Sequence, residues 1–433
     1  MNSYDSLLKE YNSLPSGNVY KKVIKGREYL YYQYSKNGKK YTRHVTDEEG
    51  LELLGKIIRK KTLGFQLKEE IRKNTRNFVL SQNAREFTGY VMSSDKVVAE
   101  FNHGQLVKQN EKLVPLIIKR THSLSEFLKL RVIDTSRNNA RILKKVLGIH
   151  EDKEEYLSLC SYAASITDNY WFKPKRSKLK YQAISFNSDI YFDTSLRGII
   201  TIMNRNSSPS PDLTTGGSYE KGWKLVDGEW WLYKKGNNNE YISELFYAYL
   251  MEELGVPTAH YEMDENYIRT KNFAKGYNYE PLASIMGEDE DYNHVLDKLL
   301  EINVNIAEQY LVLIYYDTIL NNVDRHNQNC GLLRDQKTGQ IISLAPNFDD
   351  NMCLISRDDE LNRAKNEGFL SYFLNFIKRN NKAKELYQSM DLPVIDEKIL
   401  DRVIKKIPFD FDSDKVKEFI LNRYQFIKEE VDK

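Results

Sequence analysis

The sequence is poor in cysteine and contains no long apolar segment. Its three cysteines, Cys160, Cys330 and Cys353, are too few and too widely spaced for a disulfide framework or a cysteine-ligated zinc site. No run of 18 apolar residues is present, so no transmembrane helix is expected. The first residues lack the basic and apolar regions of a secretory signal. These absences predict a soluble protein in the reducing cytoplasm, without membrane association.

A large excess of charge of either sign is also missing. The 433 residues include 64 Lys and Arg and 62 Asp and Glu, and the resulting net charge of +2 argues against a general polyanion binder. Hydrophobic residues make up 41% of the chain, which is enough for a sizeable core and too many for a disordered protein. The positive charge is concentrated near the N-terminus, where residues 1–76 hold 17 basic and 9 acidic side chains.

Residues 1–76 have the pattern of a small β-β-β-α module. Three short segments rich in Tyr, Val and Ile are separated by turn pairs, and the Asn-Gly pair at 37–38 is a strong hairpin signal. A capping-box spacing from Thr46 to Glu49 then begins a helix. The apolar face of this helix is expected to consist of Leu51, Leu54, Ile57 and Ile58.

Two functions fit this basic module. The favoured interpretation is a docking domain whose Lys and Arg side chains form a solvated face. The alternative is nucleic-acid binding, because the basic side chains are interleaved with aromatic ones. The aromatic residues in question are Tyr29, Tyr31, Tyr32 and Tyr34.

Residues 77–205 are expected to form a connector followed by a helical middle domain. Residues 77–115 show no strong periodicity and predict one or two strands. From about 123 to 165, apolar residues recur at helical spacing, which predicts an all-helical packing domain. Residues 168–180, which include a run of basic side chains, are expected to form an exposed crossover.

A glycine-rich segment at 213–221 begins the part of the chain that points to chemistry. Gly216 and Gly217 are flanked by hydroxyl residues, and such a backbone can approach phosphate oxygens closely. A glycine turn without a ligand is the alternative. Residues 224–234 then predict a β-hairpin with an Asp-Gly turn, and Lys234 ends its second strand. Such a lysine is either a solvent-facing edge residue or a phosphate ligand.

The next element predicted is a helix over residues 241–254. Gly255 and Pro257 follow it and supply a stop signal. Glu244 lies early in this helix and could pair with Lys234. The alternative is an ordinary carboxylate near the positive end of the helix dipole.

The pattern most typical of catalysis is Asp-Arg-His-Asn-Gln-Asn at residues 324–329. Asp349 follows Asn329 by 20 residues, after two short predicted strands. Phosphoryl transfer needs a carboxylate beside the attacking hydroxyl and oxygen ligands that hold Mg²⁺ against the phosphates. Asp324, Asn329 and Asp349 would supply these groups. A loop whose Asp and Asn satisfy only turn hydrogen bonds is the alternative, but the glycine loop and the Lys–Glu pair upstream favour phosphoryl transfer.

Residues 206–433 resemble the HipA-like kinases, and residues 213–221 are especially similar to the CtkA branch of that family. The motif at 324–329 also occurs in lipid kinases of the phosphatidylinositol type, whereas Ala-Pro-Asn-Phe-Asp at 345–349 favours the HipA side. The resemblance covers about half of the chain, with the motifs in the family's order. It implies an α+β, two-lobed protein-kinase-like fold that uses ATP and Mg²⁺.

The resemblance also implies roles for individual residues. Asp324 would be the catalytic base, and Asn329 and Asp349 the Mg²⁺ ligands, while Arg325 and His326 would brace the loop. The residues expected to bind ATP are Thr215, Gly216, Gly217, Ser218, Lys234, Glu244, Lys271 and Phe273. The candidates for autophosphorylation are Thr214, Thr215 and Ser218, and Thr214 matches the position of the family's regulatory serine.

The expected domains are therefore a basic module at 1–76, a connector and helical domain at 77–205, and a kinase domain at 206–433. The N-lobe is expected at about 206–275 and the C-lobe at about 276–433. The two accessory regions depart from the family's usual N-terminal part, which leaves the substrate open.

The resemblance implies a protein Ser/Thr kinase. The resemblance also implies that the protein could be the toxin of a toxin–antitoxin or mobile-element system. Its partner would then be an antitoxin or a DNA-binding protein. One alternative is a catalytically idle kinase fold that binds nucleic acid or serves as a scaffold. The presence of all four key site residues, Lys234, Asp324, Asn329 and Asp349, argues against it. Another is a small-molecule or lipid kinase, but no basic amphipathic helix suited to a membrane surface is evident.

Overall fold

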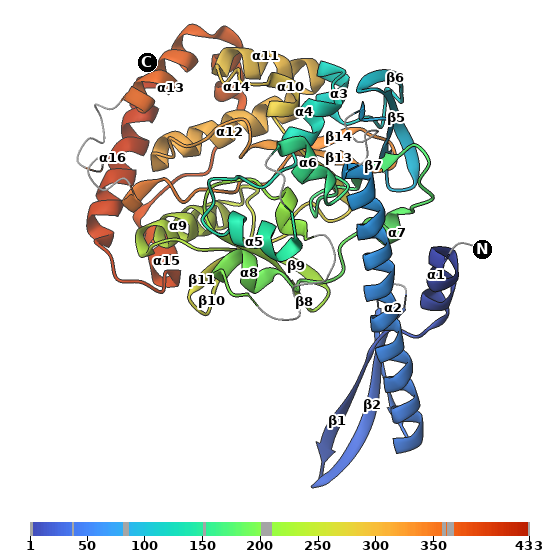
Figure 1. The fold of residues 1–433 in the computed structure, drawn as a ribbon. Helices are drawn as coiled ribbons and strands as arrows, with labels where there is room; N and C mark the ends of the chain where they lie inside the picture. The colour runs from blue at the N-terminus through green and yellow to red at the C-terminus, as the bar shows by residue number, and fades with distance from the viewer. Residues whose placement is uncertain are drawn as a thin grey trace.

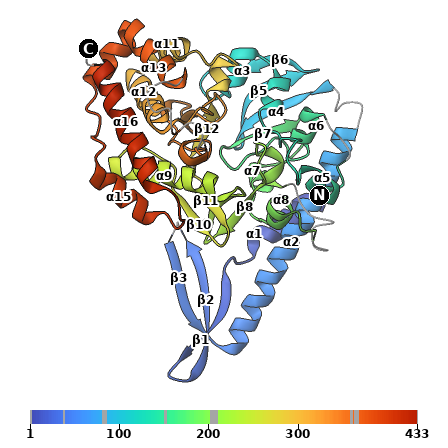
Figure 2. The ribbon, with the colours of Figure 1, turned by 90° about the vertical axis from the view of Figure 1, so that its left-hand side faces the viewer.

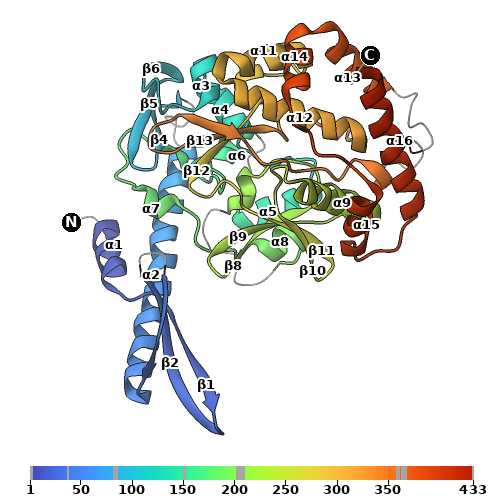
Figure 3. The same cartoon turned by 180° about the vertical axis from the view of Figure 1, so that it is seen from behind.

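The computed structural model describes residues 3–36, 39–80, 86–149, 153–200, 210–356, 361 and 368–431. They form an elongated N-terminal module and a larger body (Figures 1 and 3). No helix in these ranges is long and apolar enough to cross a membrane. The predicted Asn-Gly turn at 37–38 and the Pro- and Ser-rich residues 206–209 lie outside the described residues.

The N-terminal module confirms the predicted β-β-β-α order. Its elements are α1 (Ser3–Ser13), β1 (Asn18–Ile24), β2 (Arg27–Lys36), β3 (Lys39–Val45) and α2 (Asp47–Leu80). The strands form an antiparallel sheet in the order β1-β2-β3, and one face of it packs on α2 through Tyr32, Val45 and Ile57. Helix α1 was not predicted. Leu7, Leu8 and Tyr11 pack on the neighbouring core, and so few apolar residues give a weak helical pattern in the sequence.

The predicted apolar face of α2 is only partly correct. Ile57 is buried against the sheet, but Leu51 and Ile58 are 69% and 55% exposed. Farther along α2, Leu67 packs with Met92 and Trp171 of the middle region. Helix α2 thus joins the sheet of the module to the body of the protein.

Residues 123–165 contain helices, as predicted, but the sheet of the middle region was not predicted: one or two strands were expected at 77–115, where three are present, and none was expected at 170–174. The region contains a four-stranded antiparallel sheet in the order β6-β5-β4-β7. Its strands are β4 (Gly89–Ser93), β5 (Lys96–Asn102), β6 (Gln105–Gln109) and β7 (Tyr170–Pro174). These strands are short and β7 is remote in sequence from the others, so alternation over any one segment gave little signal. The expected exposed crossover at 168–171 is buried, and Trp171 has an exposure of 0%.

Six short helices of the described residues lie beside this sheet, three of them within the predicted stretch 123–165. They are α3 (Leu116–Thr121), α4 (Leu124–Lys129), α5 (Ala140–Leu147), α6 (Glu154–Leu159), α7 (Tyr181–Ile184) and α8 (Phe192–Arg197). Apolar residues of α3 and α4 pack on the sheet in one core. Helix α5 and the segment before α8 form a second core with Leu213, which precedes the glycine-rich loop.

The N-lobe is a four-stranded antiparallel sheet with one long helix. It comprises η3 (Pro211–Thr214), β8 (Lys221–Val226), β9 (Glu229–Lys234), α9 (Asn238–Leu254), β10 (Tyr261–Asp264) and β11 (Tyr267–Lys271), with the strand order β10-β11-β9-β8. Asn237 and Glu240 form a capping box that starts α9, and Gly255 ends it in the left-handed conformation, as predicted. Strand β9 is an interior strand, so the lysine at its end does not lie at a sheet edge.

The C-lobe is mainly helical. Its helices are α10 (Ala283–Met286), α11 (Tyr292–Ile302), α12 (Val304–Leu320), α13 (Gly368–Arg379), α14 (Asn381–Ser389), α15 (Glu397–Lys406) and α16 (Ser413–Val431). Its strands are β12 (Tyr277–Pro281), β13 (Gly331–Asp335) and β14 (Ile341–Leu344). Helix α12 is the most buried, and α15 and α16 lie at the edge remote from the middle region (Figure 2). The predicted two-lobed α+β architecture is confirmed.

A buried polar junction holds the middle region against the C-lobe. The guanidinium of Arg334 on β13 pairs with Glu280 on β12 and donates to the carbonyl oxygens of Lys112 and Val114, at 2.8 and 3.0 Å. Glu280 also accepts a hydrogen bond from the hydroxyl of Tyr170 on β7. Both members of this ion pair are nearly fully buried, so removal of either would leave an unpaired buried charge. The middle region and the C-lobe therefore pack as one body.

Candidate active site

A cavity of about 550 Å³ lies between the N-lobe sheet, the C-lobe loops and the middle region. This volume is in the range of sites for nucleotide-sized ligands. Eleven of the residues predicted for the site line it: Thr214, Thr215, Gly216, Gly217, Ser218, Lys234, Lys271, Phe273, Asp324, Asn329 and Asp349. The remaining one, Glu244, is 1% exposed and lies behind Lys234.

Lys234 is held by two carboxylates from different elements. Its ammonium nitrogen lies 2.7 Å from Glu244 of α9 and 2.8 Å from Asp349 of the C-lobe. Burial opposes the charged ammonium, but the two carboxylates outweigh it and raise the pKa of Lys234. The lysine therefore stays protonated and links the two lobes across the cavity.

The segment that follows α12 forms the candidate catalytic loop. Asn321 ends α12 in the left-handed conformation, and Asp324, which is exposed and lines the cavity, follows three residues later. The side-chain amide of Asn329 donates to the carbonyl oxygen of Asp324 at 2.6 Å, and its oxygen accepts from the backbone N–H of His326 at 2.9 Å. These two bonds close the loop and place Asp324 and Asn329 on one wall of the cavity.

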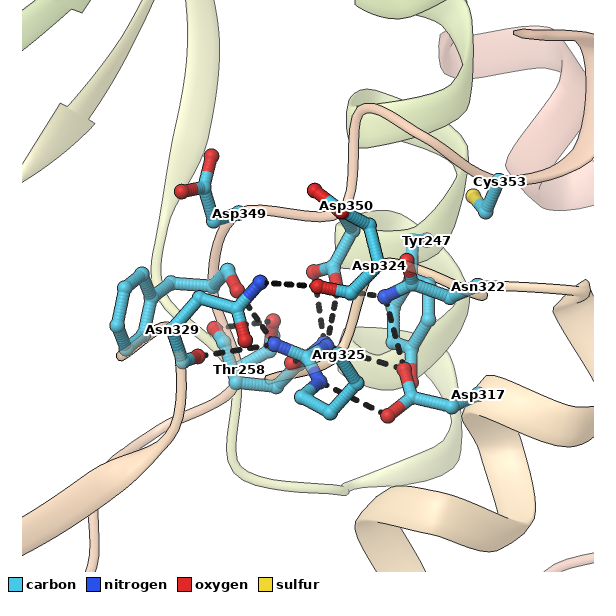
Figure 4. Close-up of polar contacts among 12 residues, drawn as sticks. Tyr247, Thr258, Asp317, Asn322, Asp324, Arg325, Asn329, Asp349, Asp350 and Cys353 are labelled. Atoms are coloured by element: carbon cyan, nitrogen blue, oxygen red, sulfur yellow. Dashed lines mark hydrogen bonds and ion pairs between the residues drawn. The ribbon is translucent and has the colours of Figure 1, made fainter. Parts of the chain in front are cut away.

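Arg325 ties this loop to the segment that carries Asp349. Its buried guanidinium binds Asp317 of α12 at 2.8 Å and also pairs with Asp350 (Figure 4). The same guanidinium donates to the carbonyl oxygens of Asn329 and Phe348, at 3.0 and 2.8 Å. Burial raises the pKa of Asp350 to about 7, even though Arg325 lies beside it. Arg325 is thus a bracing residue below the cavity.

Asp349 occupies an unusual backbone position. Its φ is +65°, a left-handed conformation that a non-glycine residue adopts at some cost and that is often found at functional sites. Its backbone N–H donates to the hydroxyl of Tyr261 at 3.1 Å. Burial alone would raise the pKa of this carboxyl, but the ammonium groups of Lys234 and Lys221 hold it well below its usual range. Asp349 is therefore ionised and able to bind a cation.

Lys221 is a site residue that was not predicted from the sequence. It begins β8, is 6% exposed and lines the cavity. Burial lowers the pKa of its ammonium to about 8, although Asp349 opposes this change. A Cβ added to Gly217 would lie 2.4 Å from this ammonium nitrogen, and Gly217 has a φ of +88°. The glycine is thus needed both for the turn and for the approach of the lysine.

Arg137, from the middle region, is a second residue that was not predicted. It is 2% exposed, and its guanidinium donates to the carbonyl oxygens of Thr215, Gly216 and Gly217 at 2.7 to 2.9 Å. The carbonyl and the N–H of a peptide unit point in opposite directions. Because three successive carbonyls face Arg137, the N–H groups of the next residues, up to Ser218, are turned away from it. The glycine loop lines the cavity and Arg137 does not, so the loop lies between them.

The segment at 270–273 lines the same cavity. Thr270 is 7% exposed and lines the cavity, and its hydroxyl has no hydrogen-bond partner among the described residues. The backbone N–H of Lys271 donates to the carbonyl oxygen of His260, and that of Asn272 donates to the carbonyl oxygen of Trp230 on β9. Phe273 contacts Phe348 with ring centroids 5.3 Å apart. An unsatisfied hydroxyl beside an aromatic wall fits a heterocycle such as adenine.

The three candidate phosphorylation sites differ in exposure. Thr214 is buried, and its hydroxyl donates to the carbonyl oxygens of Ala164 and Pro211 at 2.7 and 3.1 Å. The hydroxyl of Thr215 also donates to Pro211 and accepts from the indole N–H of Trp223. Ser218 is exposed at the tip of the loop. In this conformation only Ser218 presents its hydroxyl openly.

The cation site expected from the sequence contains one carboxylate and one amide. Asp349 and Asn329 line the same cavity, and no cluster of three or more His, Cys, Asp or Glu suited to a metal occurs within the described ranges. Mg²⁺ keeps several waters and is commonly bound through one or two carboxylates together with substrate phosphates. This donor set therefore fits Mg²⁺ bound with a nucleotide better than a stand-alone metal centre.

No protein-family model and no curated protein matches the sequence. Among solved structures, the proinflammatory kinase CtkA of Helicobacter pylori is 22% identical, with 49% of this chain and 91% of that chain covered and a TM-score of 0.36. HipA of Shewanella oneidensis MR-1, from a toxin–antitoxin complex with HipB and operator DNA, is 13% identical. It covers 80% of this chain and 100% of its own, with a TM-score of 0.46. The matched structures thus include a HipA and the kinase CtkA, the family and the branch that residues 206–433 resemble.

Lys221 is expected to make nucleotide affinity depend on pH. Its protonated form attracts the triphosphate, so ATP binding should raise its pKa above the value of about 8 in the free protein. Affinity for ATP should then fall about tenfold between pH 7 and pH 9, as the ammonium loses its proton. Titration calorimetry at several pH values measures this change. Lys221→Met should bind weakly at pH 7 and lose the pH dependence, whereas Lys235→Met, an exposed neighbour, should keep it; the same pH profile in Lys221→Met would contradict the assignment.

Arg137 is expected to act on the phosphates of a nucleotide and not on its base. Arg137→Ala should weaken binding of ATP and ADP by about tenfold or more and leave adenosine affinity unchanged, since only the phosphates would meet the glycine loop in the expected binding mode. Arg137→Lys should restore little, because the shorter lysine side chain does not extend to the position of Nη2, which contacts all three carbonyls, and lacks the Nε donor to Gly217. Arg141→Ala removes an exposed arginine from the same region and serves as the control. Equal loss of adenosine and ATP binding would show a general packing role.

Proposed function

We propose that this chain is a Mg²⁺- and ATP-dependent kinase that phosphorylates Ser or Thr residues of proteins. The observation that carries the proposal is the convergence of Lys234, Asp324, Asn329 and Asp349 on one cavity with the glycine-rich loop. These residues come from both lobes. The unpartnered hydroxyl of Thr270 and the two buried lysines of the cavity, Lys221 and Lys234, support a nucleotide as the ligand.

In the proposed reaction, Asp324 orients the attacking hydroxyl toward the γ-phosphate of ATP and accepts the proton of that hydroxyl. Lys234 and Lys221 face the phosphates from the N-lobe, and the N–H groups of the glycine loop lie above them. Asp349 and Asn329 would hold Mg²⁺, which supplies charge neutralisation at the phosphate oxygens when bound. Glu244 keeps Lys234 in place once Asp349 engages the cation.

The partner that we propose rests on the sequence resemblance. HipA-like kinases include toxins of toxin–antitoxin pairs, so we propose an antitoxin or another DNA-binding protein as the partner. A cytoplasmic location fits the cysteines Cys160, Cys330 and Cys353, which form no disulfide among the described residues. Copurification of the tagged full chain from its host, followed by mass spectrometry, tests the partner.

Two other functions remain as outcomes of the activity test. A catalytically idle kinase fold would bind ATP and transfer nothing. A small-molecule or lipid kinase would transfer phosphate to a non-protein fraction. Incubation with radiolabelled ATP and a host lysate, followed by separation of proteins, lipids and small metabolites, distinguishes all three.

Removal of the two carboxylates should separate catalysis from metal binding. Asp324→Ala should lower turnover by two or more orders of magnitude while ATP still binds, because the hydroxyl loses its base. Asp349→Ala should abolish Mg²⁺-dependent turnover, since the phosphates lose their main counter-ion, and should remove the Mg²⁺ dependence of ATP binding. Label transfer and calorimetry measure the two effects. Asp410→Ala, at an exposed C-lobe site, is the control; turnover of Asp349→Ala near the wild-type level would mean that another group binds the cation.

Autophosphorylation is expected within residues 214–218, with Thr214 as the preferred site by the resemblance. Because the Thr214 hydroxyl is buried, its modification requires the loop to open, and close to two added negative charges would then prevent it from closing beside ATP. The modified protein should bind ATP more weakly. Intact mass and peptide mapping after incubation with Mg²⁺ and ATP locate the phosphate, with Thr214→Ala and Ser218→Ala as a matched pair. An active preparation without phosphate on this loop would contradict the expectation.

A further inference from the structure

The sheet of the N-terminal module has one face that no other described element covers. The opposite face packs on α2 through Tyr32 and Val45. From the strand registers, the open face is formed by the even-numbered residues of β1 and β3 and the odd-numbered residues of β2. The module extends away from the body of the protein, so this face is accessible (Figures 1 and 3).

The two faces differ in charge. None of the positions on the open face holds Asp or Glu, while Lys22, Arg27 and Lys40 lie on it, one from each strand, and all three are exposed. On the helix side Lys21 pairs with Glu28 and Arg43 with Glu49, each at 2.6 Å, so that face carries charges of both signs. Within the described residues, Lys22, Arg27 and Lys40 form no ion pair. The open face therefore differs from the helix side in holding basic residues and no acidic one.

The same face carries a continuous group of aromatic rings. Tyr20 and Tyr31 are stacked across β1 and β2, with centroids 6.0 Å apart. His44 of β3 lies 5.7 Å from the rings of both Tyr29 and Tyr31. The ammonium of Lys22 lies 5.9 Å from the centroid of Tyr31. The half-buried tyrosine rings, with His44 edge-on to two of them, form an aromatic platform on the strand surface that is bordered by cations.

We infer that this open face binds single-stranded nucleic acid, a function separate from phosphoryl transfer. Phosphates would contact Lys22, Arg27 and Lys40, and bases would stack on Tyr20 and Tyr31. Cations without carboxylates match a polyanion, and exposed rings match unpaired bases. A duplex keeps its bases stacked inside and offers no ring face to the tyrosines. An acidic protein partner would use the cations but would not need the platform.

The test measures binding of the full-length chain to labelled 20-nucleotide oligomers by fluorescence anisotropy. Single-stranded DNA and RNA of mixed sequence are compared with a duplex of the same length. Three phosphate contacts predict that affinity for the single strand falls roughly 20-fold between 50 and 200 mM salt. Tyr31→Leu, which keeps an apolar side chain on the strand, should weaken single-strand binding about tenfold.

The control uses the two faces of the same strands. The triple variant Lys22→Gln, Arg27→Gln, Lys40→Gln should abolish most of the binding and leave kinase activity unchanged. The triple variant Lys21→Gln, Lys36→Gln, Lys39→Gln removes the same charge from the helix side and should bind nearly as wild type. Equal loss in both triples would overturn the inference, as would tighter binding of the duplex. A folded chain that binds no oligomer at 50 mM salt would leave a protein-docking role for the module.

Discussion

The guanidinium of Arg325 is the contact on which the geometry of the cavity depends. It is buried to 4% exposure and binds two fully buried carboxylates, Asp317 and Asp350. Charges buried in this way are stable only when every partner is present, and removal of one partner from such a pair typically costs about 3–5 kcal/mol. Because the same group also binds the backbone of Asn329 and Phe348, the loop that ends at Asn329 and the segment that carries Asp349 cannot move independently.

The middle region takes part in the site in two ways. It supplies a wall of the cavity through residues such as Arg131 and Asp168, which form a bidentate ion pair with N–O distances of 2.6 and 2.8 Å. It also supplies Arg137, which fixes the carbonyl side of the glycine loop. The N-lobe sheet alone therefore does not set the shape of the phosphate site, and the buried Arg334–Glu280 pair keeps the middle region in register with the C-lobe.

Most of the site residues could be predicted from the sequence because they lie in short local motifs whose order along the chain is typical of one fold. Asp324 and Asn329 lie in one loop, and Lys234 and Glu244 lie 10 residues apart at the end of a strand and the start of a helix. Arg137 could not be found this way, since 80 residues separate it from Gly217 and no spacing rule connects them. Lys221 could not be predicted as a site residue either, because its burial depends on how β8 packs near the C-lobe. The middle sheet was missed because β7 is distant in sequence from β4, its neighbour.

The length of α2 has a consequence for the selection of targets. Its 34 residues correspond to about 50 Å of helix, and Leu67 anchors it in the core of the middle region. A molecule held by the sheet at the far end would be tethered at a nearly fixed distance from the cavity. Tethering raises the effective concentration of whatever hydroxyl that molecule brings within reach and excludes those that the spacing cannot serve. The length of the helix would then favour substrates whose acceptor hydroxyl lies at the right distance from the bound segment, whatever the sequence around that hydroxyl.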